Sequence, residues 1–441
     1  MFSSARAALL LGAFALLSAE GCKNDEDCSL LGRCDAATST CKCDAGWTGT
    51  ACGRADLLPL DVANGYQNPS AASWGGRPLR GPDGKWHLFS TEIARECPLI
   101  LFMNNSQVVR SEADRPEGPY VRQEVVLPPF HHNPQVVGPT PDGFYLLFTI
   151  GTTKPDVSLQ IECRGGGPPS QCTERSNNFC RGTHMPISNG QINLAWSKSV
   201  RGPWQEKVVL PYDADGNASA WNCENNNPTA TILQNGTVLL AYRANVCAKS
   251  SGGGAGGGES LGVAVAAHWN ATYVRRVGKP IVSVADGTGD HEDPFLWQDA
   301  RGHFHMITHD QNTNNRCGSR AAGSSCAAHL FSRDSYTWTV GAAPVYTPSV
   351  TLSNGTVAQF QTRQRPQLVF DEATMAPAFL FSGGGFFGSN PDCTHLTHTY
   401  AQGFATAATA NTANTAAITT GIATATTAAT TAAAAAAEQH G

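Results

Sequence analysis

Short segments in which apolar and polar side chains alternate recur between about residue 60 and residue 405. Each alternating segment follows a polar turn, such as Asp83-Gly84 before the first of them. Period-two alternation after such a turn is typical of a β-hairpin. The pattern therefore predicts five hairpins, whose alternating strands are residues 85–89, 144–148, 237–242, 303–306 and 377–381.

A polar residue followed by proline opens each of these repeats. The five pairs are Arg77-Pro78, Asn133-Pro134, Asn227-Pro228, Asp293-Pro294 and Arg365-Pro366. The spacing of the prolines leaves room for about four strands in each repeat, and five such units in a ring remove most exposed sheet edges. The sequence predicts an all-β fold, a five-bladed β-propeller over residues 60–405 with its prolines at one level of the inner strands. An irregular β-sandwich is the alternative.

The two ends of the chain depart from this pattern. Residues 1–19 carry one early cation, Arg6, and an apolar run that closes on Ser18-Ala19, which is typical of a cleavable signal peptide. The run is too short to span a bilayer, and we expect no membrane span elsewhere. Residues 406–441 are almost only Ala and Thr, so we expect a disordered tail. The chain is therefore predicted to be secreted and extracellular.

Six of the fifteen cysteines lie within residues 20–54, namely Cys22, Cys28, Cys34, Cys41, Cys43 and Cys52. In a secreted chain, cysteines are interpreted as disulfides first. The spacing of these six, with one residue between the fourth and the fifth, resembles an epidermal-growth-factor-like (EGF-like) module. The resemblance implies pairing of the first with the third, the second with the fourth and the fifth with the sixth. It implies a contact for an extracellular protein partner but no calcium site, because only Glu20 and Gly21 precede Cys22.

The later cysteines are harder to pair. Cys223 and Cys247 lie symmetrically about the turn at Asn235, so a hairpin turning there brings them to facing positions. Cys317 and Cys326 are predicted to close a loop. The pairing of the remaining cysteines stays open; they are Cys97, Cys163, Cys172, Cys180 and Cys393, of which the middle three crowd one segment.

Five N-glycosylation sequons agree with passage through the secretory pathway. Several fall in predicted turns, where a glycan would be tolerated. They begin at Asn104, Asn217, Asn235, Asn270 and Asn354.

The charge of the chain limits its partners. Only 15% of the residues are charged, and the formal net charge is -5. No basic stripe is present to follow a phosphate backbone, so we do not expect nucleic acid as a partner.

The inner strands of a propeller bring equivalent positions together at one mouth of the central channel. Polar side chains gathered there favour a binding site, and a glycan is the partner that we expect. The residues predicted to form this polar ring are Arg77, His132, Asn133, Asn226, Asn227, Glu292, Asp293, Gln364 and Arg365.

Three further segments carry a family resemblance, namely Leu-Ala-Trp-Ser at 194–197, Gly-Pro-Trp at 202–204 and Glu-Asp-Pro-Phe-Leu-Trp at 292–297. Together with the repeats they resemble the propellers of glycoside hydrolase family 43 and its relatives. The resemblance implies an Asp general base in the first blade, an orienting Asp in the third and a Glu general acid, with inversion at the anomeric carbon. Here Arg77 and Asn227 occupy the two Asp positions, and only Glu292 matches.

Since arginine cannot accept a proton, a hydrolase would need another base. Glu92 ends the second strand of the first hairpin and is the candidate, held ionised by Arg77, while Asp293 would raise the pKa of Glu292. Hairpin symmetry in the fourth repeat places His309 opposite Glu292. The alternative is a network of salt bridges that only ties blades together.

The histidines also suggest a metal, since His303, His305 and His309 share one strand face and His132 and His291 lie elsewhere in the repeats. Single histidines in β domains are more often hydrogen-bonded, so no metal and no cofactor is predicted. Three functions stay open: a diverged glycoside hydrolase, a non-catalytic lectin or adhesion module, and a matrix interaction protein that uses only its loops.

Overall fold

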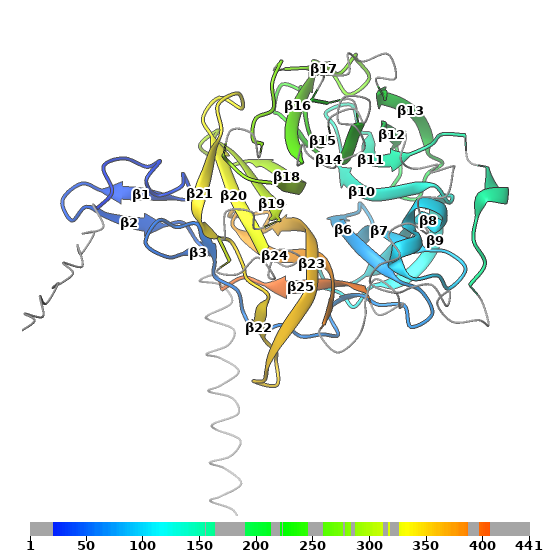
Figure 1. Ribbon diagram of the computed structural model, residues 1–441, viewed down its shortest axis with the longest axis horizontal. Helices are drawn as coiled ribbons and strands as arrows, with labels where there is room; N and C mark the ends of the chain where they lie inside the picture. The colour runs from blue at the N-terminus through cyan, green and yellow to red at the C-terminus, as the bar shows by residue number, and fades with distance from the viewer. Residues whose placement is uncertain are drawn as a thin grey trace, which may run out of the picture.

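The computed structural model describes residues 21–405, apart from residues 155, 164–189, 213–220, 223, 246–258, 277, 284–286, 312–315, 318–325 and 387–396. This part of the chain is a five-bladed β-propeller that carries an EGF-like module, so the predicted fold class is confirmed (Figure 1). The predicted signal peptide, Asn217, Cys172, Cys180, Cys223, Cys247, Cys393 and the Ala/Thr-rich tail lie outside the described residues.

The first four blades are antiparallel sheets in which the strands follow one another in chain order. Blade 1 contains β6 (Ser73–Arg80), β7 (Trp86–Ile93), β8 (Ser106–Ala113) and β9 (Val121–Leu127). Blade 2 contains β10 (His131–Val137), β11 (Tyr145–Gly151), β12 (Ile192–Ser197) and β13 (Gln205–Leu210). Blade 3 contains β14 (Glu224–Ile232), β15 (Val238–Asn245), β16 (Ser260–Ala266) and β17 (Val274–Arg275). Blade 4 contains β18 (His291–Gln298), β19 (Phe304–Asp310), β20 (Cys326–Ser332) and β21 (Thr339–Pro344).

The fifth blade closes the ring with strands from both ends of the domain. It contains β22 (Ser349–Thr351), β23 (Val357–Phe370), β24 (Pro377–Phe386), β25 (His398–Gly403) and the early strand β5 (Gly65–Tyr66). Tyr66 pairs with Thr399, which makes β5 the outer strand of this sheet. An early strand that pairs with a late one covers a sheet edge and fixes the two ends of the ring to each other.

Short helices occur in two connections. Helices η1 (Leu99–Leu101) and α1 (Phe102–Asn105) lie between β7 and β8, and η2 (Val157–Leu159) follows β11. No helix among the described residues is long and apolar enough to cross a membrane.

Apolar clusters between neighbouring blades form the core. Phe148 of blade 2 belongs to the same cluster as Leu240 of blade 3, and Leu296 of blade 4 packs in a second cluster with Leu239. The inner strands β6, β10, β14, β18 and β23 contact one another around the axis. The residues that these inner strands present to the channel therefore come from all five blades.

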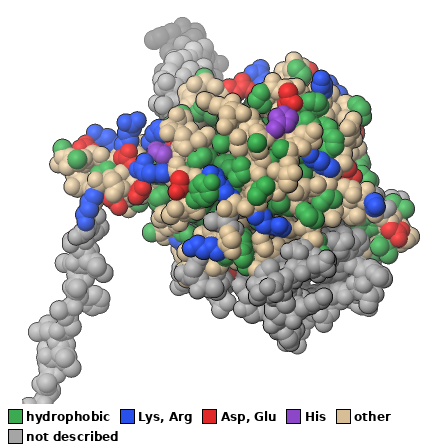
Figure 2. Space-filling model, turned by 90° about the horizontal axis from the view of Figure 1, so that it is seen from above, with side chains coloured by type: hydrophobic (Ala, Val, Ile, Leu, Met, Phe, Trp, Pro, Cys, Tyr) green, Lys and Arg blue, Asp and Glu red, His purple; other side chains and the backbone are tan. Residues whose placement is uncertain are grey.

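The EGF-like module contains β1 (Gly32–Asp35), β2 (Thr40–Cys43), β3 (Trp47–Thr48) and β4 (Arg54–Ala55). Its three disulfides, Cys22–Cys34, Cys28–Cys41 and Cys43–Cys52, have the pairing that the resemblance implies. The module projects from one side of the propeller (Figure 2). It is nevertheless packed there, since Trp47 stacks on Trp297 of blade 4 at 6.4 Å between ring centroids.

Two further disulfides lie in the described part of the propeller. Cys317 is bonded to Cys326, which closes the predicted loop. Cys97 is bonded to Cys163, a pairing that the sequence left open, across a separation of 66 residues.

Candidate functional site

Each inner strand carries a β-bulge at one level of the channel. The pairing registers break at this level in all five blades. In four blades the residue before the proline has a left-handed backbone, with φ of 53° at Asn133, 49° at Asn227, 54° at Asp293 and 55° at Arg365. This conformation is uncommon for residues other than glycine, and strained backbone of this kind tends to cluster at functional sites.

The structure corrects the predicted alignment of blade 1. Trp74 pairs with Thr91 and Arg77 with Phe89, so two residues are skipped between them, just as two are skipped between His132 and Gln135 in blade 2. The equivalent of Asn133 is therefore Gly75, with φ of 59°, and not Arg77. A Cβ atom at Gly75 would lie 2.8 Å from that of Arg365, which leaves no room for a side chain.

Arg77 therefore lies deeper in the channel, and Pro78 is not at the level of the other four prolines. The Arg77 guanidinium donates to the carbonyl oxygens of Leu368 (3.3 Å) and Val136 (3.4 Å) and lies over the ring of Phe295. Burial lowers the pKa of Arg77 to about 10, which still leaves the group charged at neutral pH. It ties blades 1, 2 and 5 together beneath the site.

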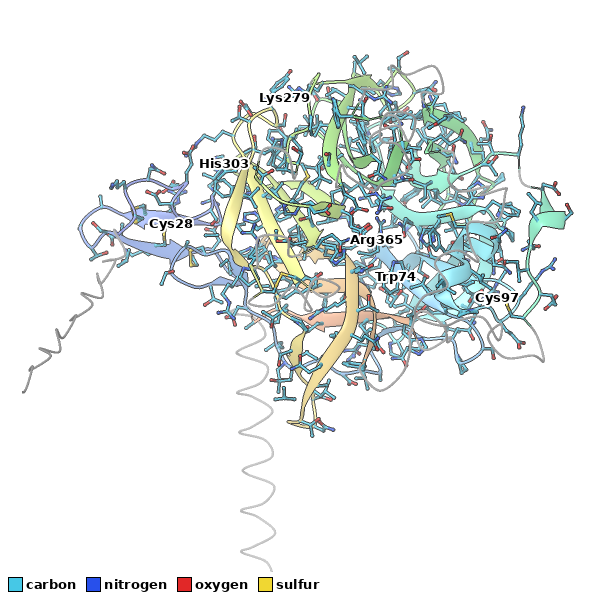
Figure 3. The ribbon with its side chains drawn as sticks, viewed as in Figure 1. Cys28, Trp74, Cys97, Lys279, His303 and Arg365 are labelled. Carbon is cyan, nitrogen blue, oxygen red and sulfur yellow. A yellow bond between two sulfur atoms is a disulfide. The ribbon has the colours of Figure 1, made fainter. Side chains whose placement is uncertain are left out.

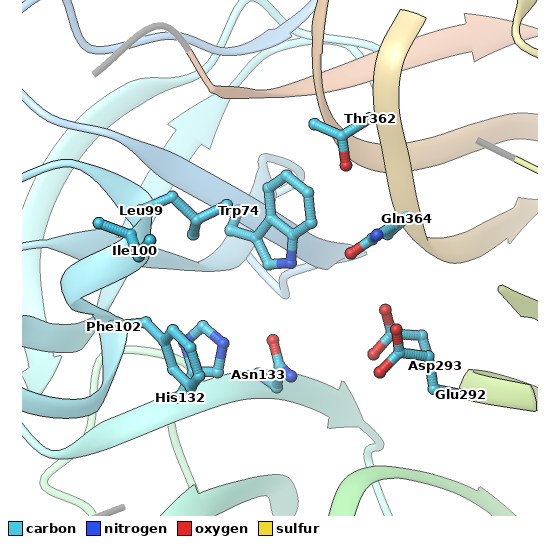
Figure 4. A pocket seen from close by; sticks show the side chains of 10 residues that line it. All are labelled: Trp74, Leu99, Ile100, Phe102, His132, Asn133, Glu292, Asp293, Thr362 and Gln364. Carbon is cyan, nitrogen blue, oxygen red and sulfur yellow. The ribbon is translucent and has the colours of Figure 1, made fainter. Parts of the chain in front are cut away.

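The bulges surround a pocket of about 300 Å³. Figure 4 shows two unlike walls, with Trp74 and Phe102 on one side and Glu292, Asp293 and Gln364 on the other. The full lining consists of Trp74, Leu99, Ile100, Phe102, His132, Asn133, Glu292, Asp293, Thr362 and Gln364. Of the predicted ring, His132, Asn133, Glu292, Asp293 and Gln364 line the pocket directly.

The apolar wall was not predicted from the sequence. It is formed by Trp74 beside the blade 1 bulge and by the helical insertion η1–α1. Trp74 and Leu99 share a hydrophobic cluster with both cysteines of the Cys97–Cys163 disulfide. The only sequence signal for this wall was the pair Gly75-Gly76, which allows a bulge without a proline.

Glu292 is the most heavily bonded group of the polar wall. Its Oε1 accepts from Gln311 (2.8 Å) and contacts His309 Nδ1 (2.9 Å), while its Oε2 accepts from Arg243 (2.7 Å). Glu292 and His309 face each other across β18 and β19, as hairpin symmetry predicted. Burial alone would raise the pKa of Glu292, but the His309 hydrogen bond and the Arg243 charge outweigh it and hold the pKa at about 2.

This direction is opposite to the one predicted from the sequence. Asp293 does lie beside Glu292, but its charge is engaged by Arg365, whose Nη1 is 3.2 Å from Asp293 Oδ1. Burial raises the pKa of Asp293 against the charge of Arg365, and the charge of Glu292 adds to the rise. Glu292 is thus the ionised member of the pair and is poorly suited to donate a proton at neutral pH.

A third carboxyl group completes the network behind the pocket. Glu259 Oε1 accepts from the same Arg243 nitrogen at 2.6 Å, whereas its buried Oε2 has no hydrogen-bond partner. Burial, followed by the charge of Glu292, raises the pKa of Glu259 to about 8. A proton shared among these groups is therefore held by Glu259.

The amides of the ring act as supports. Asn133 donates to Asn227 Oδ1 at 2.7 Å, and Asn227 lies 3.5 Å from Glu292 Oε2. His132 contacts Ser106 Oγ at 2.7 Å, and its pKa is lowered well below the usual value by burial, with a smaller effect from the charge of Arg365. His132 is therefore neutral at pH 7.

Glu92 does not lie in this pocket, so its assignment as a base at the same mouth is wrong. Side chains alternate along a strand, and Glu92 pairs with Ser73, one residue before Trp74. Its carboxylate accepts from Tyr66 (2.6 Å), Gln107 (3.0 Å) and Arg122 (3.1 Å), not from Arg77. Because Tyr66 belongs to β5, Glu92 links the ring-closing strand to blade 1.

Glu292, Asp293 and His309 each bring one potential metal-ligand atom within 4.8 Å of the others. Each of the closest atoms already has a polar partner in Arg243, Arg365 or the neighbouring carboxylate. The two arginines supply the positive charge that a cation would bring. The pocket is therefore suited to a polar uncharged ligand.

The predicted glycosylation sites differ in access. Asn235, Asn270 and Asn354 are exposed, whereas Asn104 is half-buried and donates its amide to the Leu159 carbonyl at 2.8 Å. Glycosylation of the described sequons stays a prediction, with Asn104 the least accessible of them.

Comparison with known proteins assigns a family only to the N-terminal module. A model of the EGF-like domain family matches residues 22–52. No curated protein matches the sequence.

Several solved structures resemble the chain. One is a family 117 glycoside hydrolase from Zobellia galactanivorans, with 11% identity over 81% of this chain and 90% of that one, and a TM-score of 0.48. A protein of unknown function from Dyadobacter fermentans has 12% identity over 79% and 99%, and a TM-score of 0.48. An endo-arabinase from Bacteroides thetaiotaomicron has 9% identity over 79% and 97%, and a TM-score of 0.45. With identities this low and TM-scores below 0.5, none of these proteins defines the activity of this chain.

Proposed function

We propose that this chain is an extracellular carbohydrate-binding protein that holds a saccharide in the central pocket without cleaving it. The observation that carries the proposal is the opposition of an aromatic wall to a polar wall. A sugar ring has an apolar C–H face and polar edges, so Trp74 can cover the face while Glu292, Asn133 and Gln364 bond hydroxyl groups. A volume of about 300 Å³ suits one or two sugar units.

Among the described residues of the pocket, the lack of a second, separate carboxylate argues for binding over hydrolysis. Glycosidic hydrolysis uses two carboxyl groups placed on either side of the bond, about 5 to 9.5 Å apart. Among the described residues that line the pocket, the carboxylates are Glu292 and Asp293, which are neighbours on one strand. Gly75 occupies the bulge position of blade 1 and Asn227 that of blade 3, and neither can serve as a base.

The extracellular part of the proposal rests on the N-terminal module. EGF-like modules and disulfides are typical of extracellular proteins, and the described chain has five disulfides. Secretion through the predicted signal peptide and a protein partner for the module belong to the same proposal.

A glycan array probed with the purified, disulfide-bonded chain tests the proposal, followed by calorimetry with each saccharide that binds. We expect saturable binding with no release of reducing sugar over hours. Reducing-sugar release that is lost in Glu292→Gln would instead support a glycoside hydrolase. Absence of any saccharide ligand, with the protein shown to be folded, would overturn both.

A further inference from the structure

Three side chains beside the EGF-like module form a group that the saccharide pocket does not use. Asp299 lies in the turn after β18, His303 directly precedes β19, and His305 is the second residue of β19. Figure 3 places His303 near the module, far from Trp74 and Arg365 at the centre. Asp299, His303 and His305 each bring one ligand-type atom within 4.8 Å of the others.

The spacing of these atoms fits metal ligands better than hydrogen bonds. Asp299 Oδ2 is 3.3 Å from His303 Nδ1 and 3.5 Å from His305 Nε2. Good N–H···O hydrogen bonds span about 2.7 to 3.2 Å. Ligand atoms at about 2.0 to 2.1 Å from a tetrahedral zinc ion lie about 3.3 to 3.4 Å from one another, by simple geometry.

Both ring nitrogens lack a hydrogen-bond partner. His305 is fully buried, and neither its Nε2 nor His303 Nδ1 has a partner that meets hydrogen-bond geometry. Leaving a buried polar atom unsatisfied costs about 1 to 3 kcal/mol. Two such atoms that point at one carboxylate oxygen are an arrangement that a cation would complete.

We propose that Asp299, His303 and His305 bind a divalent transition-metal ion, with zinc as the ion that best matches two imidazoles and one carboxylate. The protein supplies three ligands, and water takes the fourth position. This site is separate from the saccharide pocket and does not depend on the proposed function. Nothing in it requires a catalytic role.

Surrounding contacts hold the ligands in place. Asp299 Oδ1 accepts the backbone N–H groups of Arg301 (2.9 Å) and His303 (2.7 Å), which fixes the carboxylate. His305 Nδ1 lies 3.1 Å from His329 Nε2. When the Nε2 atom of His305 binds the metal, its Nδ1–H can donate to His329 Nε2. Such outer contacts orient metal ligands and set the tautomer of histidine ligands.

Two arginines adjoin the site, and each also pairs with a carboxylate of the EGF-like module. Arg301 Nε lies 3.0 Å from Asp299 Oδ2 and the same guanidinium bonds Asp44 of the EGF-like module. Arg333 lies 3.3 Å from His303 Nε2, a contact that it gives up when Nδ1 binds a metal, while it keeps its 2.7 Å ion pair with Glu26. The ion therefore joins a cluster that already links the module to blade 4.

Zinc titration of the metal-free, full-length chain by calorimetry tests the proposal. We expect one zinc ion per chain, with affinity reduced about a hundredfold or more in His303→Ala and in Asp299→Asn, since loss of even an outer contact typically costs 10- to 100-fold. His268→Ala is the matched control, because His268 is half exposed and lies 3.4 Å from Asp142 in another part of the propeller. Zinc binding in this control should equal that of the wild type.

A spectrum of the Co²⁺-loaded wild-type chain gives a second readout that needs no variant. A tetrahedral site with imidazole ligands should give visible d–d absorption that zinc abolishes. Absence of binding tighter than about 0.1 mM overturns the proposal. So does zinc binding that persists unchanged in folded His303→Ala, or that is lost in His268→Ala instead.

Discussion

Glu92 and Glu292 are both glutamates with little exposed surface that contact an arginine, yet they have different roles. Glu92 accepts from Tyr66 of β5, from Gln107 and from Arg122, and so fastens the closing strand of the ring to blade 1. Glu292 sits beside the bulge of blade 4, where one edge of its carboxylate lines the central pocket. Burial and an arginine partner are therefore not enough to identify a site. The position relative to the bulges of the inner strands is the distinguishing feature.

The largest effect that would sharpen this contrast is a loss of stability in Glu92→Ala. The change leaves the buried Tyr66 hydroxyl and Gln107 amide without their acceptor, while the partly exposed Arg122 can be hydrated. We expect the free energy of unfolding to fall by about 3 kcal/mol, measured by urea denaturation. Saccharide affinity of the folded protein should be unchanged, and a stability equal to that of the wild type would show that Glu92 is not a ring fastener.

Trp74→Ala tests the opposite wall of the pocket. Removing the indole exposes the sugar face to water, so we expect saccharide affinity to fall about 10- to 100-fold in calorimetry. Trp74→Phe is the matched control and should keep most of the affinity, because a smaller aromatic face remains. Equal affinities in the alanine variant and the wild type would mean that the apolar wall does not contact the ligand.

Loss of the Cys97–Cys163 disulfide should have a smaller effect on the same wall. The paired change Cys97→Ala with Cys163→Ala frees the η1–α1 insertion, which carries Leu99 and Phe102, from the segment after β11. We expect saccharide affinity to fall a few-fold, because part of the binding energy must then order the wall. If saccharide affinity fell as far as in Trp74→Ala, the disulfide would be as important for binding as the indole itself, which would contradict this prediction.

The smallest expected effect is a pH dependence of stability from Glu259. In the folded chain the pKa of Glu259 is raised to about 8 from an ordinary 4.5, so the folded state holds a proton that the unfolded state has released. The stability contribution is therefore greatest below about pH 4.5 and is lost as pH rises toward 8. We expect Glu259→Gln to flatten the fall of the melting temperature over this window. The prediction would be contradicted if the melting temperature of the wild type rose from pH 5 to pH 8 and that of Glu259→Gln changed with pH by the same amount.

Local patterns explain what the sequence could predict. Alternation within single hairpins predicted the propeller, cysteine spacing predicted the EGF-like module, and hairpin symmetry placed His309 opposite Glu292. These features depend on residues close together in the chain.

The remaining parts of the site depend on distant segments or on backbone conformation. Alignment on proline misplaced Arg77 by two residues, because Gly75 and Gly76 form the bulge of blade 1 without a proline. The apolar wall comes partly from the helical insertion between β7 and β8, and its disulfide spans 66 residues. The low pKa of Glu292 depends on Arg243 of another blade. None of these could be obtained from spacing along the chain.

Saccharide binding by Glu92→Gln and Glu292→Gln, measured side by side with the wild type, tests the central claim most directly. Both changes replace a largely buried carboxylate with an amide of the same shape, so the two variants differ in where the change lies in the fold. We predict that Glu92→Gln binds as the wild type does and that Glu292→Gln binds about tenfold more weakly, because it loses a charged acceptor for sugar hydroxyls. Equal affinities in all three proteins, or weakened binding in Glu92→Gln alone, would contradict the assignment of the central pocket as the saccharide site.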